Sequence, residues 1–312
     1  MTRHLLDFKN IEKKGLEKLI DITEKINPEK LNKISSISLL KFDEPSTRTR
    51  LSFSIAAHRL GIKTMESSDL ISAKIKGENL EHEIETYKAL GIDSIVIRTK
   101  EENLDEYREF KDISFISAGF GTVSHPTQAI VDATTLKKFG KLENDIPVVY
   151  TGDVKHSRVF KSGKELFTAL GKKVGVFTHK SFLPDDLSNI RVLSSWEEVL
   201  DSTDAIEVLR VQAERINNFE NLNLKDFVND HQLTDDILNK SDDNLIVLHP
   251  MPMNLGVEIS EQASKHDKFK YKDQLSFGIA SRISSYMYVM EKYDWVRKFY
   301  WPSYTHKISR QQ

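Results

Sequence analysis

Cysteine is absent from the 312 residues of this chain. Its absence excludes disulfide bridges, thiolate nucleophiles and metal sites built from cysteine. It also fits a reducing cytoplasm, which is the location we expect. No apolar stretch reaches the roughly 18 residues that a membrane-spanning helix needs, so we expect no contact with a membrane. The segment Met1–Asn10 lacks the apolar region of a signal peptide.

The chain also lacks an excess of basic charge. Lys and Arg number 45 and Asp and Glu number 47, which gives a formal net charge of −2. A nucleic-acid partner is therefore not expected. Any anion site must be local and built from a few arginines. The ten histidines form no pair at close helical spacing with a glutamate base, so neither a metal nor another cofactor is expected.

The chain does contain a regular alternation of short apolar runs and amphipathic stretches. The predicted strands cover 37–42, 94–97, 114–117, 148–151, 173–177, 205–208 and 245–249. The predicted helices cover 47–60, 79–90, 127–138, 158–169 and 275–292. Continuously apolar, Val/Ile-rich strands are typical of strands buried on both faces. Their alternation with helices predicts an α/β fold with parallel sheets.

The length indicates two domains of similar size, each a parallel β-sheet flanked by helices. The polar stretch 139–145 marks the expected boundary. We expect residues 1–138, together with a C-terminal helix at about 285–312, to form one domain and residues 139–284 the other. Ligands of open α/β sheets bind at the carboxyl ends of the strands, where most of the following motifs lie.

The first motif, residues 44–50, reads Glu-Pro-Ser-Thr-Arg-Thr-Arg and follows a predicted strand. A helix would begin at Ser46 or Thr47, where free backbone N–H groups and the positive end of the helix dipole favour an anion. With its hydroxyls and two arginines, the motif predicts a phosphate site. The structural alternative is a simple N-cap by Ser46, with both arginines in solvent.

Further motifs also follow predicted strands or begin predicted helices. They are His125-Pro-Thr-Gln128, Thr151–Arg158, Arg210-Val-Gln212 and His249-Pro-Met-Pro252. An arginine near a helix N-terminus suits a carboxylate, and a glutamine amide both donates and accepts hydrogen bonds. Prolines after a strand leave backbone carbonyls free for a ligand. The loop Ser72–Leu80 is polar and by itself indicates only a loop.

Together these motifs resemble the signatures of the aspartate and ornithine carbamoyltransferase family, in six blocks spread over nearly the whole chain. The resemblance implies a transferase that uses carbamoyl phosphate and no cofactor or metal. It also implies a homotrimer with shared active sites, in which Ser72 and Lys76 act in the site of a neighbouring subunit. The sequence leaves open whether a regulatory chain or a dihydroorotase partner binds.

The resemblance assigns roles to individual residues. Binding of carbamoyl phosphate is implied for Ser46, Thr47, Arg48, Thr49, Arg98, His125, Gln128, Met251 and Pro252. Thr49, Arg98 and His125 would also be catalytic, because they would converge on the carbamoyl oxygen where negative charge develops. Binding of aspartate is implied for Lys76, Arg158, Arg210 and Gln212.

Aspartate is favoured over ornithine by Glu44-Pro45, by Arg210-Val-Gln212 and by His249-Pro-Met-Pro252, which resemble the aspartate type. Aspartate presents two carboxylates, which suit two arginines, whereas the ornithine side chain is a cation. The implied products are N-carbamoyl-L-aspartate and phosphate, in the committed step of pyrimidine and UMP biosynthesis. Three positions depart from the family pattern of Arg, Asp and an aromatic residue, namely Leu255, Phe120 and Asp43.

Two alternative functions remain open at this point. One is a carbamoyltransferase for another amine, such as an ornithine derivative, which substrate competition would reveal. The other is a non-catalytic anion-binding partner, against which the complete set of motif arginines argues. The segment Gly119-Phe-Gly121 approaches a dinucleotide fingerprint but lacks the third glycine, so nucleotide binding is not expected.

Overall fold

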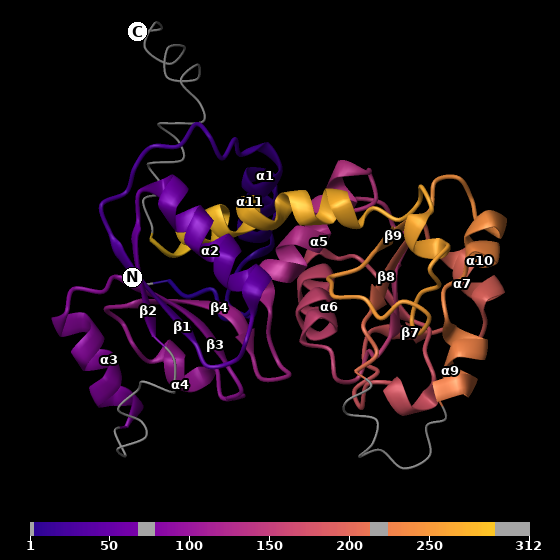
Figure 1. Cartoon of the computed structure of the whole chain (residues 1–312), viewed down its shortest axis with the longest axis horizontal. Helices are drawn as coiled ribbons and strands as arrows, with labels where there is room; N and C mark the ends of the chain where they lie inside the picture. The colour runs from indigo at the N-terminus through magenta and orange to yellow at the C-terminus, as the bar shows by residue number, and fades with distance from the viewer. Residues whose placement is uncertain (1–2, 68–78, 213–223, 291–312) are drawn as a thin grey trace, which may run out of the picture.

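The computed structural model describes residues 3–67, 79–212 and 224–290, and these form two parallel β-sheets. The strand orders are β2-β1-β3-β4 and β7-β6-β5-β8-β9. Every pairing between these strands is parallel. Figure 1 shows the two sheets side by side with helices around them. The predicted fold class is therefore confirmed.

The first sheet and its helices occupy the N-terminal part of the chain. Its strands are β1 (Ile37–Phe42), β2 (Lys63–Ser67), β3 (Ser94–Thr99) and β4 (Ser114–Phe120). The helices are α1 (Lys13–Lys25), α2 (Thr47–Leu60), α3 (Leu80–Ala89), α4 (Asp105–Arg108) and α5 (Pro126–Lys138). Strands β1, β3 and β4 are almost wholly buried, as their continuous apolar runs predict.

The second sheet follows in the chain. Its strands are β5 (Val148–Gly152), β6 (Val174–Val176), β7 (Ile190–Val192), β8 (Ala205–Leu209) and β9 (Ile246–Leu248). The helices are α6 (Arg158–Leu170), α7 (Trp196–Ser202), α9 (Leu224–His231), α10 (Asp235–Lys240) and α11 (Tyr271–Val289), with 3-10 turns at Lys180–Phe182 and Ala263–Lys265.

All seven predicted strands are present, but strands β2 and β7 were not predicted. Both lie at the edge of a sheet and expose most of their side chains, so they lack the continuous apolar run that marks an inner strand. Helix α1 was also not predicted, although Leu16, Leu19 and Ile20 give it a buried stripe at helical spacing.

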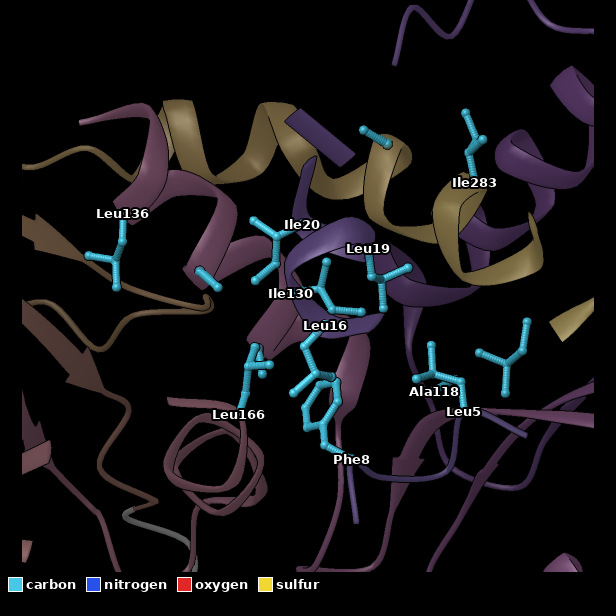
Figure 2. Close-up of a cluster of buried hydrophobic side chains, with 14 of the residues drawn as sticks. Leu5, Phe8, Leu16, Leu19, Ile20, Ala118, Ile130, Leu136, Leu166 and Ile283 are labelled. Atoms are coloured by element: carbon cyan, nitrogen blue, oxygen red, sulfur yellow. The ribbon is translucent and has the colours of Figure 1, made fainter. Parts of the chain in front are cut away.

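Five helices form the core that joins the two sheets. Helix α11 packs against α1, α2 and α5, and α5 packs against α6. Figure 1 shows α11 running across the molecule from α2 toward the second sheet. In Figure 2, Leu16 and Ile20 of α1 lie close to Ile130 of α5, with Leu166 of α6 beside them. One apolar cluster thus extends from the first sheet to the second.

Two further features concern the sequence predictions. Helix α11 begins at Tyr271, and most of the helix expected at about 285–312 lies outside the described residues. In the part of the chain that the structure describes, no helix is long and apolar enough to span a membrane.

Candidate functional site

A cavity of about 780 Å³ lies at the carboxyl ends of strands from both sheets. Its wall contains the starts of α2, α5 and α6, the segments after β8 and β9, and part of α11. The predicted site residues on this wall are Ser46, Thr47, Arg48, Thr49, Arg98, His125, Gln128, Arg158, Arg210, Gln212, Met251 and Pro252. Ser72 and Lys76 lie outside the described residues.

The N-terminus of α2, which the sequence predicts as a phosphate site, forms one end of the cavity. The helix begins at Thr47, as predicted, and directs the N–H groups of its first turn and its positive dipole end at the cavity. The described residues give the Ser46 hydroxyl no capping bond. The structure therefore does not support the alternative of a simple N-cap by Ser46, and the Ser46 hydroxyl can bind a ligand.

The two arginines of this motif have different surroundings. Arg48 lines the cavity, whereas Arg50 is not part of its wall and lies 3.6 Å from the carboxylate of Glu66 on β2. Two residues along an α-helix correspond to roughly 200° of rotation, which places the two side chains on different faces. The expectation that both arginines form the phosphate site was wrong for Arg50.

Arg98 on β3 and Arg158 at the start of α6 meet at the carboxylate of Glu44. Nη1 of Arg158 lies 3.0 Å from Oε2 of Glu44, and Nε of Arg98 lies 3.6 Å from the same oxygen. Burial, followed by the charge of Arg158, lowers the pKa of Arg98 to about 10, while Glu44 acts in the opposite direction. Glu44 therefore reduces the repulsion between two cations that the fold holds close together.

Gly119 provides the space for these two guanidinium groups. Its φ is +131°, which L side chains rarely adopt. A Cβ atom at this position would lie 3.0 Å from Nη1 of Arg98 and 3.0 Å from Nη1 of Arg158. The glycine that the sequence presented as part of an incomplete dinucleotide fingerprint thus has a steric role in the arginine pair.

His125 is buried at the N-terminus of α5, with Pro126 as the first residue of the helix. Burial lowers its pKa well below the ordinary value of 6.5, and the positive charges of Arg282, Arg158 and Arg98 lower it further. The imidazole is therefore neutral at neutral pH. Its Nδ1 atom has no hydrogen-bond partner among the described residues, so a bound group can interact with it.

Gly152 allows strands β5 and β8 of the second sheet to approach each other closely beside Arg210. Its φ is +88°, and a Cβ atom there would lie only 1.9 Å from the carbonyl oxygen of Leu209. The close approach holds the end of β8, and with it Arg210, against the loop that leads to Arg158. The Gln212 amide is 3.5 Å from the carbonyl oxygen of His156, which joins the same two loops.

The segment after β9 contributes backbone carbonyls. Met251 and Pro252 line the cavity, and the peptide bond between them is cis. The fully buried His249 accepts a hydrogen bond at Nδ1 from the Met251 N–H (2.9 Å), and its Nε2 lies 3.3 Å from Glu258. These contacts fix the start of the segment, so its carbonyls have a defined position.

Several wall residues were not predicted as part of the site. They include Glu44, His249, Gln274 and Arg282. Arg282 was detectable in principle, because it is an arginine in the otherwise apolar or small-residue stretch 279–287 of a helix. Among the described residues, no three His, Asp or Glu side chains are grouped as a metal site requires.

Two family models match the chain. The model of the aspartate/ornithine carbamoyltransferase carbamoyl-P binding domain matches residues 3–138. The model of the Asp/Orn binding domain of the same family matches residues 144–288. The chain belongs to the aspartate/ornithine carbamoyltransferase family. It is therefore a transferase by family membership.

Two relatives from bacteria cover almost the whole chain. An aspartate carbamoyltransferase catalytic subunit from Thermus thermophilus is 34% identical over 292 residues, which are 90% of this chain and 96% of that protein. The subunit of the same name from Aquifex aeolicus is 31% identical and covers 92% of this chain and 99% of its own length.

Solved structures of the carbamoyltransferase family have the same fold. The catalytic subunit of M. jannaschii aspartate transcarbamoylase has a TM-score of 0.78 at 28% identity, over 93% of this chain and 99% of that one. An ornithine carbamoyltransferase from Thermus thermophilus also has a TM-score of 0.78, at 21% identity, over 93% of this chain and 100% of that one. The overall fold therefore does not distinguish the two amine substrates.

The three departures from the family pattern have different surroundings. Phe120 is fully buried, with its ring centroid 5.0 Å from that of Tyr107, so it fills the core rather than the cavity. The carboxylate of Asp43 lies 3.4 Å from the buried Lys41 ammonium. Leu255 is half exposed, and nothing in the structure explains its presence.

Proposed function

We propose that this chain transfers the carbamoyl group of carbamoyl phosphate to the amino group of L-aspartate, giving N-carbamoyl-L-aspartate and phosphate. One observation carries the proposal. A single cavity joins an anion site at the N-terminus of α2 to two arginines of the second sheet, Arg158 and Arg210. Such a cavity suits a phosphate at one end and a dicarboxylate at the other. The names of the two bacterial relatives support the same reaction.

The phosphate group would lie at the start of α2. Ser46, Thr47 and Thr49 supply hydroxyl groups, and the helix supplies backbone N–H donors and a positive dipole end. Arg48 adds a guanidinium, which can bind a phosphate through two parallel hydrogen bonds. The leaving phosphate would stay bound to the same groups during the reaction.

The carbamoyl oxygen would be stabilised by Thr49, Arg98 and His125. The neutral imidazole of His125 can donate a hydrogen bond to this oxygen. Because it carries no positive charge, it does not attract the phosphate group in place of the carbamoyl oxygen. As the amine attacks, the oxygen gains negative charge, and the three groups stabilise that charge more than they stabilise the substrate. Each such donor typically lowers the barrier by about 3–4 kcal/mol.

The carbamoyl NH2 would donate to Gln128 and to the backbone carbonyl oxygens of Met251 and Pro252. One acceptor lies near the start of α5 and the other two lie in the segment after β9. The carbamoyl group would therefore be held by groups from the parts of the chain that carry the two sheets. Because all three groups accept hydrogen bonds, they favour an NH2 group, which donates, over a carbonyl oxygen, which can only accept.

Aspartate would be held by Arg158, Arg210 and Gln212, with Lys76 assisting. Arg158 contacts Glu44 in the structure, so binding of a substrate carboxylate requires this ion pair to loosen or to share the guanidinium. The arginines orient the amine toward the carbamoyl carbon, and much of the rate would come from this orientation. No covalent intermediate is needed, and the departing phosphate can accept the amine proton.

The charges of the wall favour aspartate over ornithine. The acid identified on the wall near Arg98 and Arg158 is Glu44, and both arginines already engage it.

The test is to incubate the chain with carbamoyl phosphate and either L-aspartate or L-ornithine, and to measure phosphate and carbamoylated product. Product with aspartate alone supports the proposal, whereas product with ornithine alone contradicts the assignment of Arg210 and Gln212.

We also propose that the active assembly is a cytoplasmic homotrimer in which Ser72 and Lys76 complete the site of a neighbouring subunit. This part rests on the family resemblance. Mixing the impaired variants Lys76→Ala and Arg48→Ala under subunit-exchange conditions should raise the activity above that of either variant alone, because some sites would then combine two intact halves. Mixtures that exchange subunits without any gain in activity would contradict shared sites.

The remaining proposals concern organisation and pathway. We place the domain boundary at residues 139–145, with the carbamoyl-phosphate domain before it and the aspartate domain after it, and we assign the helix expected at about 285–312 to the first domain. The reaction would be the committed step of pyrimidine biosynthesis. Co-purification at native expression levels would identify a regulatory chain or a dihydroorotase partner.

A further inference from the structure

Two buried carboxyl groups lie behind the cavity wall, where α5, β8 and α11 come together. Asp132 lies on α5, one turn after Gln128, and Glu207 lies in the middle of β8. Gln274, in the first turn of α11, lies between them. The exposed fractions of the three residues are 1%, 1% and 2%. Polar groups with so little access to water must satisfy one another.

The amide of Gln274 uses all its principal hydrogen-bonding groups. Its Nε2 donates to Oδ1 of Asp132 (2.7 Å) and to Oε1 of Glu207 (3.2 Å), and an amide nitrogen has only two hydrogens. Its Oε1 accepts from the backbone N–H of His249 at 2.9 Å. Gln274 therefore ties a helix of the first sheet to a strand of the second and to the cavity segment after β9.

Asp132 extends this network to the cavity. Its Oδ1 also accepts a hydrogen bond from Nε2 of Gln128, at 2.9 Å. Gln128 lines the cavity, and its nitrogen is committed to Asp132. The oxygen Oε1 of Gln128 is then the atom that can accept a hydrogen bond from a ligand. Asp132 thus determines which end of the Gln128 amide a carbamoyl NH2 meets.

The charge balance of this region favours a bound proton. Arg282 of α11 is the cation whose charge acts on Asp132, and its Nη1 donates to Gly278 and Ser281. The phenol of Tyr150 on β5 also faces both carboxyl groups and carries no charge at neutral pH. One guanidinium against two carboxylates would leave an excess negative charge in the interior, which is costly.

The hydrogen bonding of Asp132 also favours a bound proton. Oδ2 of Asp132 is buried and has no hydrogen-bond partner among the described residues. A full negative charge on a carboxylate with one such oxygen is disfavoured. Burial raises the pKa of Asp132 to about 7, and burial together with the charge of Asp132 raises the pKa of Glu207 well above its ordinary value.

We propose that Asp132 and Glu207, bridged by Gln274, form a carboxyl pair that retains a proton at neutral pH and positions the carbamoyl-binding amide. That amide is Gln128. Both carboxyl groups act through other side chains and touch no substrate, so they are positioning residues. The positioning part rests on the proposed carbamoyl transfer, whereas the retained proton does not.

The proton is tested by infrared difference spectroscopy on the full chain at neutral pH. The carbonyl stretch of a protonated carboxyl group should be present in the wild type and lost in Glu207→Gln, which preserves the hydrogen-bond acceptor. The matched control is Thr135→Val on α5, whose hydroxyl donates to the Val131 carbonyl of its own helix at 2.8 Å and has no other partner among the described residues. This control should keep the band. Identical wild-type and Glu207→Gln spectra in this region would overturn the retained proton.

The positioning role is tested by kinetics. Asp132→Ala should raise the KM for carbamoyl phosphate about tenfold, the scale of one charge-assisted hydrogen bond, and change the KM for aspartate less. Asp132→Asn should recover most of the loss, because its amide oxygen still accepts from Gln128. Folding of each variant is checked by its circular dichroism spectrum. Equal losses in folded Asp132→Ala and Asp132→Asn would overturn the positioning role.

The pH profile provides a third measurement. A rise in pH removes the retained proton and brings two charges together beside Gln274, so activity should fall on the alkaline side. Glu207→Gln has no second carboxyl group to ionise, so this fall should be absent from its profile and present in those of the wild type and Thr135→Val. An unchanged profile would contradict the pair. A protonated band without any carbamoyl transfer would refute the proposed function alone, and normal transfer without the band would refute the protonated pair alone.

Discussion

The guanidinium of Arg158 contacts the carboxylate of Glu44 across the cavity, with 3.0 Å between Nη1 and Oε2. Glu44 belongs to the segment after β1 of the first sheet, and Arg158 begins α6 beside the second sheet. The same Nη1 donates to the carbonyl oxygen of Gly121 at 2.9 Å. One side chain from the second sheet is thus anchored to two segments of the first, at the point where both substrates are expected to meet.

Replacement of Glu44 should impair the catalytic geometry more than the fold. In Glu44→Gln the repulsion between Arg98 and Arg158 is no longer offset, so we expect kcat to fall about tenfold, the effect of losing one charged hydrogen bond. Steady-state kinetics with both substrates measure this. The matched control is Glu66→Gln, which breaks an exposed Glu–Arg pair and should change little. Equal effects of both variants would contradict the role of Glu44.

The phosphate site is tested by comparing two arginines of one motif. Arg48→Ala should raise the KM for carbamoyl phosphate and lower kcat, because a charge-assisted hydrogen bond to phosphate is lost. The ratio kcat/KM should fall by about 10- to 100-fold. Arg50→Ala should leave both constants within about twofold, since Arg50 pairs with Glu66 on the surface. If Arg50→Ala is the more damaging change, the cavity wall does not bind the phosphate.

Gly119→Ala should disable the site by steric crowding. The added Cβ lies 3.0 Å from both guanidinium groups, and the φ of +131° is strained for alanine. We expect a loss of about 1–3 kcal/mol in the free energy of unfolding, and a larger relative loss of kcat. Denaturant titration and steady-state kinetics measure the two effects. Gly140→Ala also has a positive φ but has nothing within 4 Å of the added Cβ, so it controls for strain alone. Activity that falls equally in both variants would argue against crowding.

The neutral state of His125 should be visible in the pH dependence of stability. Since its pKa is lowered in the folded chain, only the unfolded chain takes up this proton as the pH falls below 6.5. The free energy of unfolding should therefore decrease from about pH 7 to pH 5.

His125→Gln should remove part of that decrease, up to about 1.4 kcal/mol per pH unit. His4, His179 and His231, whose pKa values are also lowered, supply the remainder. The exposed His58→Gln is the control, and the measurement is denaturant titration at fixed protein concentration. A slope in His125→Gln as steep as that of the wild type would mean that His125 is not held neutral.

The inner strands, and the predicted residues that line the cavity, could be identified from the sequence because they carry local signals. Continuous apolar runs marked the buried strands, and the serine, threonine and arginine residues of the first motif marked a helix start that lines the cavity. The edge strands β2 and β7 expose their side chains to solvent, so they lack the pattern that identifies a buried strand.

The features that could not be predicted depend on contacts between distant segments. The partnership of Glu44 with Arg98 and Arg158 requires β1, β3 and α6 to meet at one point. The role of Gly119 depends on which side chains approach it. Gln274 joins segments up to 142 residues away in the sequence, so neither its own position nor its neighbours indicate its partners.

The central claim is that one cavity binds the phosphate end and the aspartate end of the reacting pair together. It is tested most directly by calorimetric titration with N-(phosphonacetyl)-L-aspartic acid, which carries both ends in one molecule and is bound in a solved transcarbamoylase structure from Trypanosoma cruzi. Binding should weaken at least about tenfold in Arg48→Ala and also in Arg210→Ala, because each removes one charged contact. Unchanged affinity in both folded variants would contradict a shared cavity.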